Sequence, residues 1–382
     1  MLISVAGTWM QNAAQAWLVY DLTGSSLSLG VVGACGTVPL LLFTLPAGVV
    51  ADRLSKRNIV LVTQTLAMLQ AFALAALIYS GAVKVWHVMV LAGMLGAVNA
   101  FDMPTRQAMV AELASKEDLL NAISLNSSAF NVGRIVGPAL AGVIIAAVGT
   151  AACFLVNGIT FAALIVALAQ IKPRPQGETG KAKMLAQIAD GIRWAKGHHV
   201  ARTLLMMTAV VSIFGMSYAT LLPVFAKDVF HTGPKGYGFL MSSYAMGALA
   251  SAIGLSALGH RWTMGRPLSF GSFLFPVALL AVAVSPCYAT AMASLFLTGL
   301  GMMLFNAVSN TILQKSPPDE MRGRVMSIRA LVFAGLAPLG SLQIGAMGEW
   351  LGPRFAVAIG GAICLIAAMT AWRLVPELRK SE

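Results

Sequence analysis

Long apolar stretches separated by short polar segments make up most of the chain. Twelve of them reach the length of about 20 mostly apolar residues that a membrane-spanning helix needs. They cover residues 2–20, 27–51, 59–80, 86–109, 121–148, 151–171, 201–226, 236–258, 267–285, 287–313, 324–347 and 353–374. The pattern therefore predicts twelve transmembrane helices, several of them kinked at internal prolines, which membrane helices tolerate.

A long polar segment at residues 172–200 divides these stretches six and six. Apolar residues recur within it at helical spacing, at Leu185, Ile188, Ile192 and Ala195. We expect a cytoplasmic linker with an amphipathic helix lying on the inner leaflet. The predicted domains are a six-helix bundle at 1–171, the linker at 172–200 and a second six-helix bundle at 201–382.

Composition supports an all-α polytopic membrane protein. Of the 382 residues, 58% are hydrophobic and only 10% are charged, against roughly 25% charged residues in an average soluble domain. So little charge cannot cover the surface of a soluble enzyme, and a disordered chain needs low hydrophobicity. The first stretch lacks a basic leading region and a cleavage site, so we expect a span there and no signal peptide.

The distribution of basic residues predicts the orientation. The net charge is +12. With the N-terminus inside, 22 of the 26 Lys and Arg residues fall on the cytoplasmic side, where such residues accumulate. We therefore expect a multi-pass protein of the cell's inner membrane with both termini cytoplasmic. No basic run carries interleaved aromatic residues, so nucleic acid is not an expected partner.

The two halves repeat each other. Asn99 and Gln107 near the end of the fourth stretch recur 207 positions later as Asn306 and Gln314. Six spans return the chain to its starting side, so the two repeats have the same orientation. This plan is found in many secondary carriers, whose substrates bind between the halves.

The segment after the second stretch reads Gly48-Val-Val-Ala-Asp-Arg-Leu-Ser-Lys-Arg57. It resembles the hallmark loop of the major facilitator superfamily, with Ser55 at a position that is usually glycine. The second-half copy, residues 254–266, has no aspartate. Residues 133–142, Gly-Arg-Ile-Val-Gly-Pro-Ala-Leu-Ala-Gly, resemble the antiporter motif of drug–proton exporters in that superfamily.

Two further strings, Phe-Asp-Met-Pro-Thr-Arg-Gln at 101–107 and Arg-Gly-Arg-Val at 322–325, resemble the exporter branch that includes bacterial enterobactin and multidrug exporters. The resemblance covers essentially the whole chain. It implies the major facilitator fold, with twelve helices in two parallel six-helix repeats.

The charged loop is a candidate gate. We expect Gly48 to let two helix ends approach closely, with Arg53 beside Asp52. Asp52 can accept hydrogen bonds at the start of another helix, where the dipole favours an anion. The resemblance implies the helix that starts near Arg322 and Arg324. An ordinary solvated turn remains an alternative interpretation.

Asp102 is the candidate for coupling transport to protons. It lies in the cytoplasmic third of the fourth span, and intramembrane charges are costly and usually paired. We expect it to pair with Arg134 of the fifth span or with Arg106, four residues on along the same helix. The pair is either a static structural feature or a site where Asp102 takes up a proton as the pair opens.

Polar and aromatic side chains within the spans are candidates for binding a substrate. Lipid cannot satisfy the amides of Gln11 and Gln15, so they should face the bundle interior. The other candidates are Asn99, Phe214, Tyr218, Tyr244 and Asn306. For each of them, helix–helix contact is an alternative to substrate contact.

No residue pattern indicates an enzyme. Gly177 to Lys181 is too short for a phosphate loop, and the histidines form no ligand pair. We expect no cofactor or metal. The favoured function is a monomeric, proton-coupled exporter of small amphipathic molecules, drug-like or siderophore-like. The alternatives are a gradient-driven importer, or a sensor or enzyme on the same scaffold.

Overall fold

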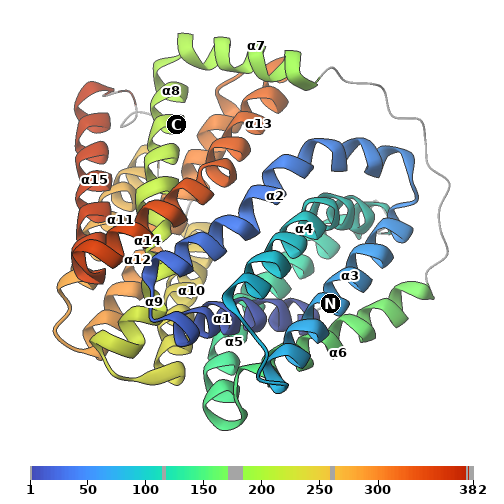
Figure 1. The fold of residues 1–382 in the computed structure, drawn as a ribbon. Coiled ribbons are helices and arrows are strands. Elements are labelled where there is room, and N and C mark those ends of the chain that lie inside the picture. The colour runs from blue at the N-terminus through green and yellow to red at the C-terminus, as the bar shows by residue number, and fades with distance from the viewer. Residues whose placement is uncertain (1, 114–117, 171–183, 259–262, 376, 378–382) are drawn as a thin grey trace. The chain divides into compact units, whose positions relative to one another are not determined.

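The computed structural model describes residues 2–113, 118–170, 184–258, 263–375 and 377, and all of the regular elements among them are helices. In chain order they are α1 (Leu2–Thr23), α2 (Ser26–Arg53), α3 (Lys56–Tyr79), α4 (Val85–Leu113), α5 (Leu119–Val148), α6 (Thr150–Ala169), α7 (Met184–Gly197), α8 (His199–Val210), η1 (Val211–Gly215), η2 (Met216–Leu221), α9 (Leu222–Val224), η3 (Phe225–Val229), α10 (Gly233–Leu258), α11 (Gly265–Val284), α12 (Tyr288–Lys315), α13 (Asp319–Gly335), α14 (Ala337–Leu351) and α15 (Pro353–Leu374). Figure 1 shows them as a ribbon.

The helices match the predicted stretches. Within the described residues, eleven segments are long and apolar enough to cross a membrane. The helix α1, with 22 residues, covers the first predicted stretch in addition. The protein is an all-α polytopic membrane protein.

The chain forms two compact units. The first consists of Met1–Gly180 with Ala226–Ser242, and the second of Lys181–Phe225 with Ser243–Glu382. The helix predicted inside the polar segment is present as α7, which packs against α13 and α8. The linker residues 171–183 lie outside the described residues.

Glycines determine how closely the helices of the first unit approach. A Cβ on Gly96 of α4 would overlap the carbonyl of Gly36 on α2. A Cβ on Gly137 of α5 would lie 2.6 Å from the carbonyl oxygen of Ala6 on α1. Small residues let membrane helices touch along their backbones, where van der Waals packing replaces the hydrophobic driving force. The antiporter-like motif is therefore in close contact with α1.

The close approach expected at Gly48 is absent from the structure. No heavy atom of the described residues lies within 4 Å of a Cβ built there. The tight contact on α2 is made about three turns earlier, at Gly36. Pro39 and Pro46 follow it inside the helix, and the surface between them is exposed, with Leu42 at 67%. Phe43 in this part of α2 still contacts Phe101 of α4, with ring centroids 6.4 Å apart, and Ala47 is fully buried. The open space is therefore local to Gly48.

In the second unit, α12 has glycine contacts with two neighbours. A Cβ on Gly299 would overlap the carbonyl of Tyr244 on α10, and one on Gly301 would lie 2.5 Å from the amide nitrogen of Phe275 on α11. The α2–α4 contact of the first unit is thus matched by the α10–α12 contact of the second. This agreement is what a duplicated six-helix unit predicts.

The seventh predicted span is an interrupted helix. After α8 the backbone passes through a π-helical turn, η1, a 3-10 segment, η2, the short α9 and a second π-helical turn, η3. Such interruptions inside a span are tolerated where protein covers the freed backbone groups, and they often mark functional sites. Phe214, Ser217 and Tyr218 lie within this irregular stretch.

Candidate functional site

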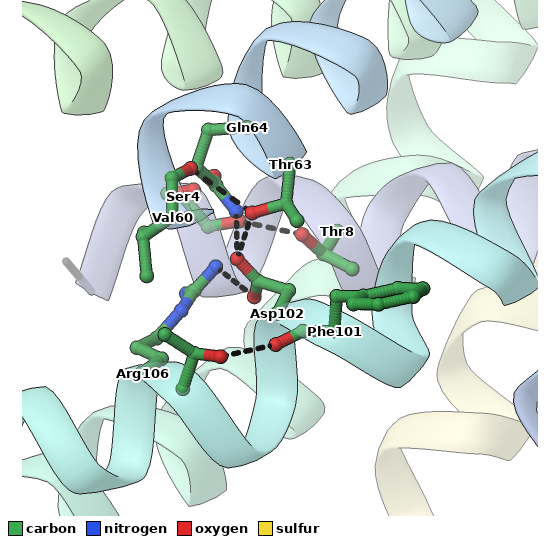
Figure 2. Close-up of polar contacts among 9 residues, drawn as sticks. Ser4, Thr8, Val60, Thr63, Gln64, Phe101, Asp102 and Arg106 are labelled. Atoms are coloured by element: carbon green, nitrogen blue, oxygen red, sulfur yellow. Dashed lines mark hydrogen bonds and ion pairs between the residues drawn. The ribbon is translucent and has the colours of Figure 1, made fainter. Parts of the chain in front are cut away.

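Asp102 is the centre of a buried polar cluster in the first unit (Figure 2). The residue is 4% exposed. Its Oδ2 accepts a hydrogen bond from Nη2 of Arg106 at 2.6 Å, which is also an ion pair. Its Oδ1 accepts from Thr63 Oγ1 and from Gln64 Nε2, both at 2.8 Å. The carboxylate thus accepts hydrogen bonds from three donors, one of them a guanidinium, so its two oxygens are held by α3 and α4 together.

Two helices supply this cluster. Asp102 and Arg106 are one turn apart on α4, so their side chains lie on one face. Thr63 and Gln64 come from the first half of α3, which packs along α4. Asp102 is the eighteenth residue of α4, about 25 Å from the helix start. Its charge is therefore held deep in the span by its neighbours.

Arg134 takes no part in this pair. The sequence left Arg134 and Arg106 as alternative partners of Asp102, and the structure places Asp102 against Arg106. Nε of Arg134 is buried without a hydrogen-bond partner. Arg134 forms no ion pair or hydrogen bond with the described residues, and its neighbour Gly133 packs on Val5 and Ala6 of α1.

A second buried cluster ties α1 to α3 and α6. Gln11 donates from Nε2 to Gln70 Oε1 at 2.8 Å, and its own Oε1 accepts from Asn157 Nδ2 at 2.7 Å. Gln11 is 1% exposed, and Gln70 and Asn157 are fully buried. Both ends of the Gln11 amide are thus used inside the unit, so this candidate is not available to a substrate here.

The other two polar candidates of the first unit remain accessible. Gln15 lies one turn after Gln11 on α1, and Asn99 lies one turn before Met103 on α4. Both are half-buried, and neither forms a side-chain hydrogen bond with the described part of the chain. Their amides can therefore still bind another molecule.

In the second unit, Asn306 holds an arginine whose role the sequence did not reveal. Nη2 of Arg329, on α13, donates to Oδ1 of Asn306 at 2.6 Å and to its carbonyl oxygen at 3.1 Å. Nε of Arg329 is buried without a partner. In the sequence, Arg329 is visible as a cation inside an apolar stretch. It also fits the general accumulation of Lys and Arg at the inner ends of spans, so its position did not single it out.

The aromatic candidates of the second unit lie together in part. Tyr218 and Tyr244 pack edge to face, with ring centroids 5.9 Å apart. The hydroxyl of Tyr244 donates to the sulfur of Met216 at 3.8 Å. Phe214 is half-buried on the π-helical turn η1, and its carbonyl packs against Gly360 of α15. The interrupted span and α10 therefore bring two rings into contact.

The candidate gate is described only at one of its ends. Asp52 and Arg53 end α2, and their side chains lie outside the described residues. Arg322, at the start of α13, is exposed, pairs with Asp319 at 2.5 Å and donates to the carbonyl of Gln314 at 3.0 Å. Arg324 is half-buried, and its Cβ approaches Gly191 of α7. Closure by Asp52 thus stays a prediction.

The first unit also has an ionic cluster, not foreseen from the sequence, at the end of α1. Lys227 on η3 pairs with Asp21 at 2.6 Å, and Tyr20 donates to Asp228. Trp17 stacks on Tyr237 close by, with ring centroids 6.0 Å apart. Within the described residues, no group of three His, Cys, Asp or Glu side chains is placed to hold a metal ion.

Solved structures show what this architecture is. The nucleoside transporter NupG superposes with a TM-score of 0.79 over 98% of this chain and 97% of that one, at 13% sequence identity. A D-xylose–proton symporter superposes with a TM-score of 0.76 over 99% and 98%, at 14% identity. The fold is that of the major facilitator superfamily of transporters, with two six-helix repeats.

The family follows from sequence. The model of the transmembrane secretion effector family matches residues 1–382, and the chain belongs to this family. The Staphyloferrin A transporter of Staphylococcus aureus is 29% identical over 91% of this chain and 87% of its own length. The multidrug efflux pump Tap of Mycolicibacterium fortuitum is 26% identical over 92% and 88%. The protein is thus a multi-pass membrane transporter of small molecules, and its relatives are transporters rather than enzymes.

Proposed function

We propose that the protein is a proton-coupled exporter of small amphipathic molecules, drug-like or siderophore-like, working by alternating access. The efflux pumps among its relatives support export. The excess of Lys and Arg in the predicted inner loops supports an inner-membrane protein with both termini in the cytoplasm. We assign substrate contact to Gln15, Asn99 and Asn306, with the rings of Phe214, Tyr218 and Tyr244.

The pair of buried Asp102 with half-buried Arg106 is the observation that carries the coupling. A carrier driven by protons needs a group that binds a proton in one conformation and releases it in another. Asp102 is buried and paired with one removable cation, so opening of the pair would leave the carboxylate in a site where proton uptake can replace that cation. It is also the one carboxylate of the chain predicted to lie deep in a span.

Gln64 is suited to both protonation states of Asp102. Its Nε2 donates to the carboxylate, while its Oε1 is buried without a partner. Rotation of the amide by half a turn would present Oε1 to a protonated carboxyl group, which then has an O–H to donate. Gln64 can thus keep one hydrogen bond to Asp102 in either protonation state, through Nε2 to the carboxylate or through Oε1 to the carboxyl O–H.

The test is driven efflux by Asp102→Asn, measured with a panel of amphipathic substrates in cells stripped of their own exporters. We expect efflux driven by the proton gradient to fall at least about tenfold, or about 1.4 kcal/mol in the barrier. Substrate exchange without a gradient should persist in proteoliposomes. Asp21→Asn is the matched control, because the Asp21 side chain is 58% exposed and pairs outside the cluster.

Each result decides between interpretations. Unchanged driven efflux in Asp102→Asn at normal protein level would exclude Asp102 as the coupling group. Loss of folded protein would make the pair a structural one. An uncoupler that leaves wild-type efflux unchanged would refute proton coupling as a whole, and accumulation of substrate inside cells would establish import.

A further inference from the structure

The second unit carries a groove that the proposed transport cycle does not use. It lies where α10 ends and α11 begins, with α12 as its floor, and has a volume of about 420 Å³. Its lining is apolar except at two points: Arg266 on α11 and Ser251 on α10. Ser251 is 5% exposed, and its Oγ is buried without a hydrogen-bond partner. A hydroxyl left unpaired in an apolar groove is costly unless another molecule supplies its partner.

A second, shallow and open depression, mainly apolar, runs along one face of α11, and all of its lining residues lie on that helix. It has a volume of about 530 Å³ and extends from Arg266 past Phe273 to Val277. Arg266 and Phe270 line both grooves. Phe270 is 58% exposed, so it forms a ridge shared by the two. The cation Arg266 therefore lies at one end of both apolar features, which we call the first slot and the second slot.

The positive charge of Arg266, at the shared end of the two slots, attracts an anion. Arg266 is exposed, and its guanidinium forms no ion pair or hydrogen bond with the described residues. It is the second residue of α11, at the end of this helix that the charge distribution predicts to enter the membrane from the cytoplasm. Arginines at that level bind phosphate groups of lipids through paired hydrogen bonds and a permanent positive charge.

The depth of the grooves matches one leaflet. Arg266 and Val277 are eleven residues apart, or about 16 Å along a helix. Half of the hydrocarbon core of a bilayer is about 15 Å. Val277 is 50% exposed, so the slot opens sideways towards the lipid. Gly254 lines the first slot, and a Cβ built there would meet nothing within 4 Å.

From this geometry we propose that the α10–α11 groove binds one anionic diacyl phospholipid. Its phosphate pairs with Arg266, and its two acyl chains occupy the two slots on either side of Phe270. Ser251 Oγ donates to an ester oxygen of the chain in the first slot. The predicted orientation places this lipid in the cytoplasmic leaflet.

The experiment compares lipids on purified protein in detergent. Phosphatidylglycerol, phosphatidylcholine and inorganic phosphate are added separately, and retention by native mass spectrometry and the melting temperature are recorded. The wild type should retain phosphatidylglycerol and gain more stability from it than from phosphatidylcholine. Arg266→Gln should bind phosphatidylglycerol about tenfold more weakly, the loss expected for a charge-assisted contact. Gly254→Leu should fill the first slot and weaken both lipids.

The control is Arg373→Gln, which removes an equal charge from an exposed position in the last turn of α15. It should keep the preference for phosphatidylglycerol. Equal preference in Arg266→Gln and in wild type would overturn the proposal, as would the same stabilisation by inorganic phosphate alone. A dimer that dissociates when Phe270 is replaced by Asp would make the groove an interface between copies. If a groove variant loses transport while it still retains phosphatidylglycerol, the groove is a site for the substrate instead.

Discussion

Polar side chains inside the first unit differ in whether their hydrogen bonds are already used. Gln11 uses both ends of its amide in the interior, on Gln70 and Asn157, whereas Gln15 and Asn99 present amides without a partner among the described residues. A satisfied and buried amide stabilises the fold, and an unsatisfied, accessible one can select a ligand. We therefore expect Gln11 and Gln15, two residues of the same type one helical turn apart, to have different roles.

Gln11→Leu tests this division. The change leaves Gln70 and Asn157 without their partner, at a cost of about 1–3 kcal/mol for buried groups. We expect a lower melting temperature in detergent, while the KM for substrate per folded molecule stays unchanged. Gln15→Leu is the control and should show the reverse, a raised KM at an unchanged melting temperature. A raised KM in Gln11→Leu without loss of stability would place Gln11 in the binding site.

At this scale the sequence predicts partners along a helix better than partners across helices. The spacing of Asp102 and Arg106 is four residues, so their contact follows from helix geometry alone. Thr63 and Gln64 lie on another helix, and a single sequence does not reveal how α3 is rotated against α4. Arg329 was missed for the same reason, because its partner Asn306 comes from a different helix.

Backbone contact at glycines decides how the elements pack. The pairs α2–α4 and α10–α12 approach so closely that a single methyl group would not fit at Gly96 or Gly299. Position in the sequence did not reveal which glycines do this. Gly48 belongs to the most recognisable motif yet faces open space, and Gly96 lies in no motif.

Gly96→Ala and Gly48→Ala form a matched pair. Alanine at Gly96 forces α2 and α4 apart, and overpacking of this kind costs about 1–3 kcal/mol or more. We expect a clear loss of folded protein by fluorescence-detected gel filtration and a lower melting temperature. Alanine at Gly48 adds helix propensity without a clash, so folded yield should not fall. Equal behaviour of the two variants would contradict the packing argument.

Across the whole molecule, the two halves repeat the same helices but differ in where their acidic residues lie. The position 207 residues after Asp102 is Ser309, which is buried and donates to the carbonyl of Asn306. The second unit has no Asp or Glu between residues 243 and 318 or between 321 and 348. The proposed proton chemistry on a carboxylate inside a span would therefore take place in the first unit, while the second unit has the half-buried cation Arg329.

Hydropathy was sufficient to predict the twelve helices, because lipid imposes length and apolarity on every span. The family of folds was predicted from the resemblance carried by the motifs at 48–57, 101–107, 133–142 and 322–325. The interruption of the seventh span was not predictable. Its residues are as apolar as those of the other spans, and the π-helical and 3-10 turns depend on packing, such as the contact of Gly340 with Ser217.

The orientation of the molecule can be tested with its own cysteines. Cys287 is exposed, Cys153 and Cys364 are buried, and Cys35 is half-buried. Cys287 lies between α11 and α12, in a loop that the charge distribution places outside the cell. An impermeant maleimide should therefore label wild-type protein in intact cells and should not label Cys287→Ser. Cysteine at Ser55 in that background should be labelled only after permeabilisation. The opposite pattern would invert the topology.

The pH dependence of this labelling adds a second measurement on the same site. Hydrogen bonds from Thr290, chiefly from its side chain, lower the pKa of the Cys287 thiol. Maleimide reacts with the thiolate, so a lowered pKa makes labelling faster at neutral pH. Thr290→Val removes the hydroxyl, lets the pKa return upwards and should slow labelling at about pH 7. The two rates should converge at alkaline pH, where both thiols are ionised. A labelling rate at neutral pH that does not depend on Thr290 would show that the hydroxyl does not stabilise the thiolate.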